Sequence, residues 1–211
     1  MARAPEIGRV KTRLAATVGS SAALEIYRWL GRRAISAACG VRDATVVVQY
    51  TPAHQQSLIV EWLGAPDMSG IRARPQVEGD LGARMRAAIG DALDSGATSV
   101  IVIGTDSPDL SSSVIEEAFD MLARCDVVVG PAHDGGYYLL GVRATHAVLF
   151  EDIPWSTDDT MRRTIDAAQS AGLRVALLDR LLDIDTADDW RAWTASEAAA
   201  GQGAPGVLGS G

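Results

Sequence analysis

Short apolar segments alternate along this 211-residue chain with longer segments in which apolar residues recur at helical spacing. The clearest apolar runs are 98–104 (TSVIVIG) and 126–130 (DVVVG), which predict fully buried strands. Further strands are expected over 44–50, 71–74, 137–142 and 173–178. Parallel strands joined by helices need crossover connections, so the alternation predicts a three-layer α/β/α fold with a mostly parallel central sheet. Ligands of such folds bind at the carboxyl ends of the strands.

The segments between these strands carry the helical pattern. The first helix is expected to begin with Ser20 as its N-cap and to end at Gly40. The others are expected over 54–63, 80–93, 111–124, 144–150, 158–171 and 186–199. A chain of this length fits one domain, which we place at residues 1–200. The Gly-rich tail 201–211 is expected to be disordered.

Acidic residues outnumber basic ones, which gives a net charge of −8 at pH 7. A surface of this sign repels polyanions, so binding to nucleic acid is not expected. Cys39 and Cys125 lie far apart without histidine partners at ligand spacing, which argues against a zinc site or a disulfide framework. No apolar run approaches the roughly 18 residues of a membrane span, and residues 1–13 are too polar for a secretory signal. We therefore expect a soluble, cytoplasmic protein.

The basic charge is concentrated near the start of the chain. Residues 1–33 carry seven basic and two acidic side chains, a net charge of +5 that leaves −13 for the remainder. Lys11 is the single lysine of the sequence, and Arg9 and Arg13 flank it in the segment GRVKTRL. This placement, between a loop and a helix-like segment, indicates an anion site. A solvated basic surface in an arginine-rich chain is the alternative.

Two groups of carboxylates follow predicted strands. Asp106 comes directly after the strand that ends at Gly104, in the sequence TDSPD, and Asp185 lies in the sequence DIDTADD after the last strand. Carboxylates at adjoining strand ends suit Mg²⁺ or Mn²⁺, which take oxygen ligands and bridge to phosphates. Each group also has a simpler explanation. TDSPD is an ordinary turn sequence in which Asp109 could cap the next helix, and Thr186 with the following aspartates suits a helix start.

Three further segments could line a crevice. The segment HDGGYYLLG places Asp134, Gly135, Gly136 and Tyr137 where backbone can approach a ligand, although a turn into an edge strand explains it equally well. The segment 78–85 (EGDLGARM) could donate backbone N–H groups to an anion or only start a helix. An aromatic residue such as Trp155, followed by Ser156, is more often a packing anchor than a pocket wall.

Several familiar motifs do not occur in the sequence. It contains no G-x-x-x-x-G-K-[ST] motif, no G-x-G-x-x-G motif after a strand and no G-x-S-x-G motif. The sequence therefore gives no motif that would support P-loop nucleotide hydrolysis, Rossmann dinucleotide binding or hydrolase-type acyl transfer.

Six segments taken together resemble the DUF2064 family in their order and spacing. They are Ala4–Leu14, Gly79–Gly82, Gly104–Asp109, Asp134–Tyr138, Ile153–Thr157 and Asp183–Thr186. Each is weak alone, but the ordered set is specific for the family and covers residues 2–190. The family is often labelled as a glycosyltransferase and is linked to arsenosugar biosynthesis. Its fold is similar to that of GT-A-type nucleotide-diphospho-sugar transferases, 2-phospholactate guanylyltransferase and molybdenum-cofactor nucleotidyltransferases.

The resemblance implies roles for individual residues. Arg9, Lys11 and Arg13 would hold nucleotide phosphates, and Asp106 with Asp185 would bind Mg²⁺ or Mn²⁺, which makes Lys11 and Asp106 the expected catalytic residues. The nucleoside would be bordered by Gly79, Leu81 and Gly82. A small-molecule acceptor would be faced by Asp134, Gly135, Gly136 and Tyr137, with Trp155 and Ser156 on the opposite wall.

One feature departs from the family pattern. Relatives have a buried apolar strand that runs into the segment at Ala4–Pro5, whereas only Met1 and Ala2 precede Arg3 here. The first central strand is therefore expected to be missing or truncated. Either translation starts upstream of Met1, which is the favoured explanation, or the chain lacks a central strand and exposes neighbouring backbone and apolar faces. Added upstream apolar residues are expected to raise thermal stability.

The reaction stays open between two forms of transfer. A dense basic loop suits a triphosphate, so nucleotidyl transfer from a nucleoside triphosphate is slightly favoured. The family label favours glycosyl transfer from a nucleotide-sugar. A non-catalytic nucleotide-binding protein is the third possibility. The sequence does not identify the base, the sugar, the acceptor or the oligomeric state.

Overall fold

The computed structural model describes residues 1–64 and 71–199 of the chain. Its strands are β1 (Ala2–Arg3), β2 (Val47–Thr51), β3 (Arg72–Pro75), β4 (Val100–Ile103), β5 (Val127–Pro131), β6 (Tyr137–Val142) and β7 (Val175–Leu177). Its α-helices are α1 (Thr12–Val18), α2 (Ser20–Cys39), α3 (Gln56–Leu63), α4 (Leu81–Asp94), α5 (Ser112–Leu122), α6 (Thr160–Ser170) and α7 (Ala187–Ala199), with short 3₁₀ helices η1 (Ala53–Gln55) and η3 (Ala147–Leu149). The tail 201–211, expected to be disordered, lies outside the described residues.

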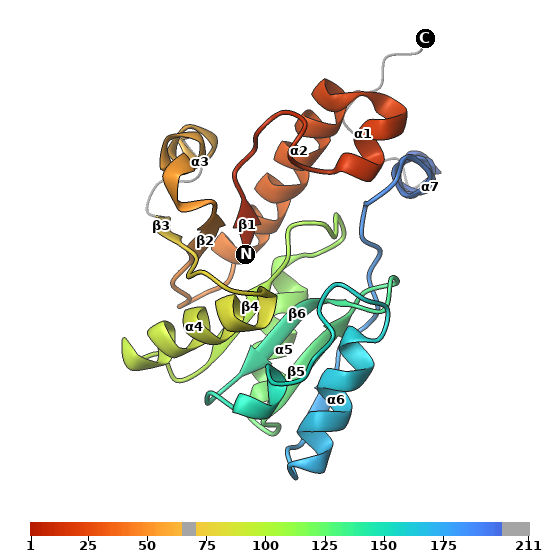
Figure 1. Cartoon of the computed structure of the whole chain (residues 1–211). Coiled ribbons are helices and arrows are strands. Elements are labelled where there is room, and N and C mark those ends of the chain that lie inside the picture. Colours follow the sequence, from red (N-terminus) through yellow and green to blue (C-terminus); the bar gives the residue numbers. More distant parts are fainter. Residues whose placement is uncertain (65–70, 200–211) are drawn as a thin grey trace.

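The strands form two sheets rather than one (Figure 1). The three-stranded sheet has the order β1-β2-β3, and its strands are all parallel. The four-stranded sheet has the order β4-β6-β5-β7, in which β6 runs antiparallel to both β4 and β5 while β5 and β7 are parallel. The α/β class is confirmed, and the predicted central sheet is divided in two with one antiparallel strand inside the larger part.

Helices cover both faces of the four-stranded sheet, which gives the expected three layers (Figure 1). Successive residues of β5 point to opposite faces, as the period of a strand requires. Val128 packs in the apolar cluster that contains α5 and the end of α2, whereas Val127 and Val129 pack in the cluster that contains α4 and α6. Burial of β5 on both faces explains why its sequence reads as a continuous apolar run.

Helix α7 packs against α2 through tryptophan side chains. Trp190 and Trp193 of α7 pack against Trp29 of α2, with ring centroids 5.7 and 5.1 Å from it. The indole N–H of Trp193 donates to Asp109 Oδ1 over 2.8 Å. Asp109 was a candidate cap for the helix after TDSPD, but that cap is Ser111, whose Oγ accepts from the N–H of Val114. Asp109 instead holds α7 beside the loop that carries Asp106.

Two local predictions were wrong. The N-cap of α2 is Gly19, and Ser20 is the first helical residue, because the preceding helix α1 ends at Val18 and the chain turns at a glycine with φ 85°. Strand β4 was expected to be fully buried, yet all four of its residues are only partly buried. Its edge remote from β6 has no neighbouring strand among the described residues.

None of the helices within residues 1–64 and 71–199 is both long enough and apolar enough to cross a membrane.

A glycine is required at position 82, in the first turn of α4, for a steric reason. A Cβ on Gly82 would lie 2.5 Å from the Trp155 ring, a distance that real Cβ contacts do not show. The main chain of α4 therefore approaches the indole directly, and this contact fixes the start of α4 against the segment before α6. Gly90 lies in the same helix, and a Cβ there would meet no atom within 4 Å.

These two glycines form a matched pair for a stability test. We expect Gly82→Ala to lower the free energy of unfolding by about 1–3 kcal/mol, because Trp155 must shift. Gly90→Ala should raise it by up to about 1 kcal/mol through helix propensity. Urea unfolding of both variants measures the difference, and equal stabilities would show that Trp155 does not restrict position 82.

Candidate functional site

Three loops that follow strands meet at the carboxyl ends of the sheets. The first leaves β1 and carries Lys11, the second leaves β4 and carries Asp106, and the third follows β7 and carries Asp185. The N–H of Ile184 donates to the carbonyl of Asp106 over 2.9 Å, which joins the second and third loops directly. The predicted meeting of the two carboxylate groups is therefore present in the structure.

Lys11 is the centre of this meeting point. Its Nζ lies 2.6 Å from Asp106 Oδ1 and 2.9 Å from Asp185 Oδ1, and its side chain is only 5% exposed. Arg13 also forms an ion pair with Asp185. Burial alone would lower the pKa of Lys11, but the charges and hydrogen bonds of the two carboxylates outweigh it and raise that pKa above its ordinary value. Lys11 is therefore held as an ammonium ion.

The backbone at Lys11 is left-handed, with φ 46° and ψ 48°. This conformation costs a residue with a side chain about 1 kcal/mol or more, so its surroundings must hold it. The carbonyl of Lys11 accepts from the N–H of Ala15 over 2.8 Å, which fixes the residue at the start of α1. The two ion pairs with Asp106 and Asp185 hold the end of the Lys11 side chain.

A pocket of about 240 Å³ opens beside these ion pairs. Its walls are Arg3, Arg9, Val10, Lys11, Thr12, Arg13, Tyr27, Asp106 and Asp185. The predicted residues Arg9, Lys11, Arg13, Asp106 and Asp185 are thus brought together. Within residues 1–64 and 71–199, the guanidinium groups of Arg3 and Arg9 have no carboxylate within ion-pair distance. The pocket therefore has cationic groups to offer a ligand.

Sequence reasoning gave no role in the pocket to four of its lining residues, Arg3, Val10, Thr12 and Tyr27, and hydrogen bonds join Arg3 to Tyr27. Arg3 was counted in the basic cluster but given no role, and Tyr27 was assigned only to the apolar face of a helix. The Tyr27 hydroxyl accepts from the N–H of Arg3 over 2.9 Å and donates to its carbonyl over 2.7 Å. Tyr27 therefore fixes the end of β1, a role that no sequence signal indicates because its spacing is that of an ordinary core residue.

A third carboxylate, Asp183, lies deeper beside the site. It accepts a hydrogen bond from the hydroxyl of Ser107, a residue that is itself buried. Burial raises the pKa of Asp183 to about 7, and the negative charges of Asp106 and Asp134 act in the same direction. Asp183 thus exchanges its proton near neutral pH.

The capping explanation is correct for one acid of the DIDTADD segment. Asp189 Oδ2 accepts from the N–H groups of Asp185 and Thr186, and the N–H of Asp189 donates to Thr186 Oγ1 over 3.2 Å. This reciprocal pair starts α7 and leaves the carboxylate of Asp185 free to face Lys11.

The donor set between Asp106 and Asp185 fits a hard divalent cation. Both carboxylates contact one cationic nitrogen, so the position between them accepts positive charge. Within the described ranges 1–64 and 71–199, no group of three or more His, Cys, Asp or Glu side chains is arranged to hold a metal ion. Mg²⁺ or Mn²⁺ on this pair would therefore take its remaining ligands from water and from substrate phosphates.

Helix α4 begins with an N-cap residue, and the first residue after the cap is an exposed apolar side chain. Asp80 is the N-cap and its Oδ1 accepts from the N–H of Ala83 over 2.8 Å, while Gly79 has φ 126°. Leu81 is 40% exposed, and Gly82 lies under Trp155 as described above. The helix-start interpretation of this segment is therefore correct, and its proposed contact with a nucleoside stays a prediction.

The predicted acceptor residues form a second cluster. Asp134 is exposed and accepts from the N–H of Gly136 over 2.9 Å, and a Cβ on Gly135 would lie 2.1 Å from the carbonyl oxygen of Asp158. The 134–137 loop thus packs on the segment that contains Trp155 and Ser156. Ser156 is exposed, with φ 62°.

The aromatic residue of this loop faces inward. The Tyr137 hydroxyl points to the sulfur of Met85 at 4.0 Å, and burial raises its pKa. It therefore contributes packing against α4, and contact with an acceptor stays a prediction.

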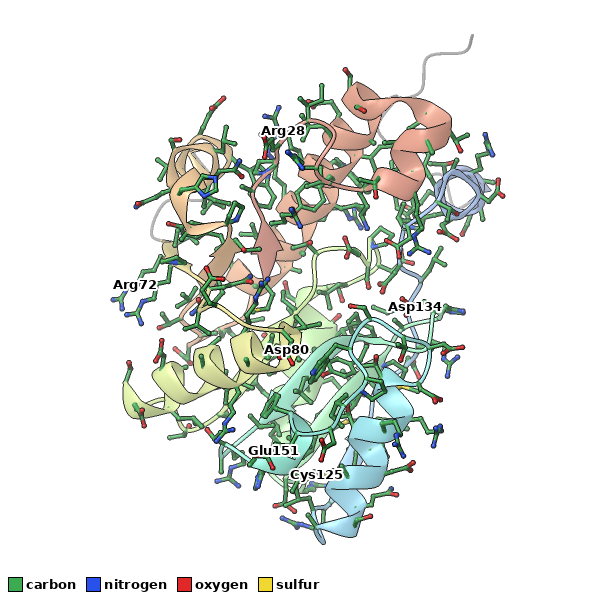
Figure 2. All side chains as sticks on the ribbon, viewed as in Figure 1. Arg28, Arg72, Asp80, Cys125, Asp134 and Glu151 are labelled. Carbon is green, nitrogen blue, oxygen red and sulfur yellow. The ribbon has the colours of Figure 1, made fainter. Side chains whose placement is uncertain are left out.

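The start of α4 and the 134–137 loop lie at the same end of the larger sheet. Figure 2 shows Asp80 and Asp134 at this end, whereas Cys125 and Glu151 lie at the opposite end. None of the residues 79–82, 134–137 or 155–156 lines the pocket beside Lys11. The arrangement is thus a charged pocket next to a mostly neutral wall.

Asp183 provides a test by pH. Its folded pKa lies above its ordinary value of 3.8, so the folded state holds a proton that the unfolded state has lost between about pH 4 and 7. Stability from this group is therefore present at low pH and lost as the pH rises through 7. We expect Asp183→Asn to be more stable than the parent at pH 8, by up to about 4 kcal/mol, with the difference shrinking toward pH 4.

Denaturant unfolding between pH 4 and 8 measures this difference, with Asp188→Asn on the exposed face of α7 as the control. Titrations of groups that do not interact with Asp183 cancel between variants. An unchanged pH slope in Asp183→Asn would show that this carboxyl is not destabilised by burial.

The comparisons with known proteins agree with this fold. Residues 34–157 match the family described as "Uncharacterized protein conserved in bacteria (DUF2064)". No curated protein matches the chain. Among solved structures, a protein of Desulfovibrio desulfuricans G20, provisionally described as a nucleotide-diphospho-sugar transferase, is 31% identical with a TM-score of 0.85. That alignment covers 92% of this chain and 84% of the other.

More distant structures share the fold alone. 4-Diphosphocytidyl-2C-methyl-D-erythritol synthase from Anaerococcus prevotii DSM 20548 is 11% identical with a TM-score of 0.58, over 80% of this chain and 86% of that one. The homologue of Mycobacterium tuberculosis Rv0371c from Mycobacterium sp. strain JC1 is 19% identical with a TM-score of 0.56, over 81% and 83%. The chain belongs to the DUF2064 family and has the GT-A-type fold of the nucleotide-diphospho-sugar transferases.

Proposed function

We propose that this protein is a metal-dependent transferase that uses a nucleotide donor, and that it transfers a nucleotidyl group from a nucleoside triphosphate. The observation that carries the proposal is the ammonium of Lys11 between the carboxylates of Asp106 and Asp185, in a pocket lined by Arg3, Arg9 and Arg13. Carboxylates for a cation and guanidinium groups for phosphate oxygens lie there side by side. This combination suits a polyphosphate bound together with its metal.

The size and charge of the pocket support a triphosphate. About 240 Å³ accommodates a chain of phosphates but little of the nucleoside, which would extend toward the neutral wall at α4. The guanidinium groups of Arg3 and Arg9 would bind the phosphate oxygens remote from the carboxylates. Negative charge that develops on a leaving pyrophosphate would be stabilised by the same cations.

In this reaction an acceptor oxygen forms a bond to the α-phosphorus, and the bond from that phosphorus to the bridging oxygen breaks. Pyrophosphate leaves, and the proton of the acceptor hydroxyl passes to solvent water or to the departing pyrophosphate. Asp106 and Asp185 would hold Mg²⁺ or Mn²⁺, which when bound neutralises phosphate charge and polarises the reacting phosphoryl group. Lys11 would move from the carboxylates to a phosphate oxygen as the donor binds. The acceptor would lie against Asp134–Tyr137 and Trp155.

Glycosyl transfer from a nucleotide-sugar is the second candidate. It is favoured by the Desulfovibrio desulfuricans G20 relative, whose description names a nucleotide-diphospho-sugar transferase. The same carboxylates and cations would then hold a diphosphate, and the acceptor would attack the anomeric carbon. A donor panel with Mg²⁺ or Mn²⁺ separates the two reactions.

We expect pyrophosphate release from a nucleoside triphosphate in that panel. Release of a nucleoside diphosphate from a nucleotide-sugar would replace nucleotidyl transfer by glycosyl transfer. Metal-dependent binding without any product would indicate a non-catalytic nucleotide-binding protein.

Asp106→Ala should abolish metal-dependent binding and turnover, and unchanged behaviour would remove Asp106 from the metal site.

Replacement of Lys11 should have opposite effects on the binding of a nucleoside triphosphate and on the binding of Mn²⁺. We expect Lys11→Met to weaken binding of a nucleoside triphosphate by about 10- to 100-fold, because a charge-assisted contact is lost. The same change should strengthen binding of Mn²⁺ alone, because the ammonium no longer competes for Asp106 and Asp185. Electron paramagnetic resonance of free Mn²⁺ and calorimetric nucleotide titration measure both effects.

The control is Arg174→Met, which removes an equal charge from the opposite end of the sheet, where Arg174 pairs with Asp126. It should change neither affinity. If Lys11→Met weakens Mn²⁺ binding, or leaves nucleotide binding intact, Lys11 does not exchange between carboxylates and phosphate.

A further inference from the structure

The loop of residues 106–109 is held along its whole length by other parts of the chain. Its first two residues are joined to the loop that follows β7. The carbonyl of Asp106 accepts from the N–H of Ile184 over 2.9 Å, and the hydroxyl of Ser107 donates to the carboxylate of Asp183. These hydrogen bonds tie the two carboxylate loops of the site together.

The other end of the 106–109 loop is held by α2 and α7. The carbonyl of Pro108 accepts from Arg33 Nε over 2.9 Å, and Asp109 Oδ1 accepts from the indole N–H of Trp193 over 2.8 Å. The guanidinium carbon of Arg33 also lies 6.0 Å from the ring centroid of Trp193 and 5.1 Å from that of Trp29. A cation at such a distance is attracted to the face of an aromatic ring, so Arg33 and Trp193 support one another as they hold the loop.

All three loops of the site rest on the same apolar cluster. This cluster contains Trp193 together with Leu14 and Ile184, which are both fully buried. Leu14 lies three residues after Lys11, and Ile184 directly precedes Asp185. The hydrogen bond from Trp193 connects the loop that follows β4 to the same cluster. The cluster therefore fixes the positions of the ammonium and the two carboxylates relative to one another.

The side chain of Asp106 has little support of its own. It is 42% exposed, against 29% for Asp185 and 5% for Lys11. Among the ion pairs of residues 1–64 and 71–199, Lys11 is the only partner of Asp106. Under the proposed function Lys11 would leave the carboxylates when the donor binds. The backbone of the loop alone would then direct Asp106 toward the cation.

We propose that Arg33 and Trp193 are positioning residues, which hold the 106–109 loop so that Asp106 and Asp185 lie at the spacing at which they share one divalent cation. This role rests on the proposed function, in which both carboxylates hold that cation. Neither Arg33 nor Trp193 lines the pocket beside Lys11, so each acts through the loop. Loss of such an outer contact commonly lowers the affinity of a metal site by about 10- to 100-fold.

Two tryptophan variants separate positioning from packing. Trp193→Phe keeps an aromatic ring but loses the N–H that donates to Asp109. Trp190→Phe removes the same atoms from a neighbour in the same cluster and leaves that hydrogen bond in place. We expect both variants to lower the melting temperature by similar amounts, because both lose packing. Only Trp193→Phe should also weaken binding of Mn²⁺, by about tenfold, as measured by electron paramagnetic resonance of free Mn²⁺.

Two arginine variants separate positioning from charge. Arg33→Met removes the hydrogen bond to Pro108 together with a positive charge, and Arg32→Met removes an equal charge from the exposed neighbour on α2. Loss of positive charge by itself strengthens the binding of a cation. We expect Arg33→Met to weaken Mn²⁺ binding by about tenfold, and Arg32→Met not to weaken it. Arg33→Lys, which keeps the charge and a donor, should restore most of the affinity.

A measurement without metal distinguishes this role from the proposed function. Lys11 is the single lysine of the sequence, so the ammonium ¹H–¹⁵N signal of the metal-free protein, labelled in lysine, reports on its ion pairs with Asp106 and Asp185. We expect Trp193→Phe and Arg33→Met to shift this signal and to speed its hydrogen exchange. Trp190→Phe and Arg32→Met should leave it as in the parent.

An unchanged Lys11 signal, or a Mn²⁺ affinity equal to that of the parent, in both Trp193→Phe and Arg33→Met would overturn the positioning role. Equal changes in the two control variants would also overturn it, because packing or charge would then account for them. If the parent binds no Mn²⁺, the proposed function fails, and the Lys11 signal alone decides whether Arg33 and Trp193 position the loop.

Discussion

The arrangement of this protein depends on a buried ammonium ion held by two carboxylates. Lys11 comes from the start of the chain, Asp106 from the middle and Asp185 from near the end, and the ion pairs between them join loops from both sheets. At such distances each pair supplies several kcal/mol of attraction, offset by the loss of hydration. The site is therefore a structural junction as well as the proposed place of the chemistry, because the sheets do not share a ladder in the described residues.

Under the proposed function, the same junction would let an acidic protein accept a phosphorylated donor. In the absence of ligand, the charges of Asp106 and Asp185 are balanced by Lys11 and Arg13. A metal–nucleotide complex would bring both a cation for the carboxylates and an anion for the basic groups, so each partner in the junction would exchange one counterion for another. A free anion or a free metal ion would satisfy only half of the site. This reciprocity supports joint binding of metal and donor.

Much of the fold could be predicted from the sequence, because apolar runs and helical spacing reflect burial directly. The strands and helices of the sheet layers occur where the patterns place them, and the α/β class is confirmed. The division of the sheet into two was not predicted, since strand pairing depends on residues distant in sequence. The runs in β4 and β5 look alike, yet β5 is buried on both faces and β4 borders a cavity.

The charged half of the site was also accessible to sequence reasoning, because acidic and basic residues at strand ends converge in a fold of this class. What could not be foreseen was the direct contact of Lys11 with both carboxylates, or the role of Tyr27 at β1. Glycines at 82 and 135 suggested open backbone, but each accommodates a close neighbour instead. Sequence shows that a glycine is needed and does not show whether a ligand or a side chain needs it.

The most direct test of this account is a crystal structure of the protein with Mn²⁺ and a non-hydrolysable nucleoside triphosphate. We expect an anomalous Mn²⁺ peak between Asp106 and Asp185, with the ammonium of Lys11 moved onto a phosphate oxygen and Arg9 on the same phosphates. A metal bound elsewhere, or a nucleotide bound while Lys11 keeps both carboxylates, would contradict it.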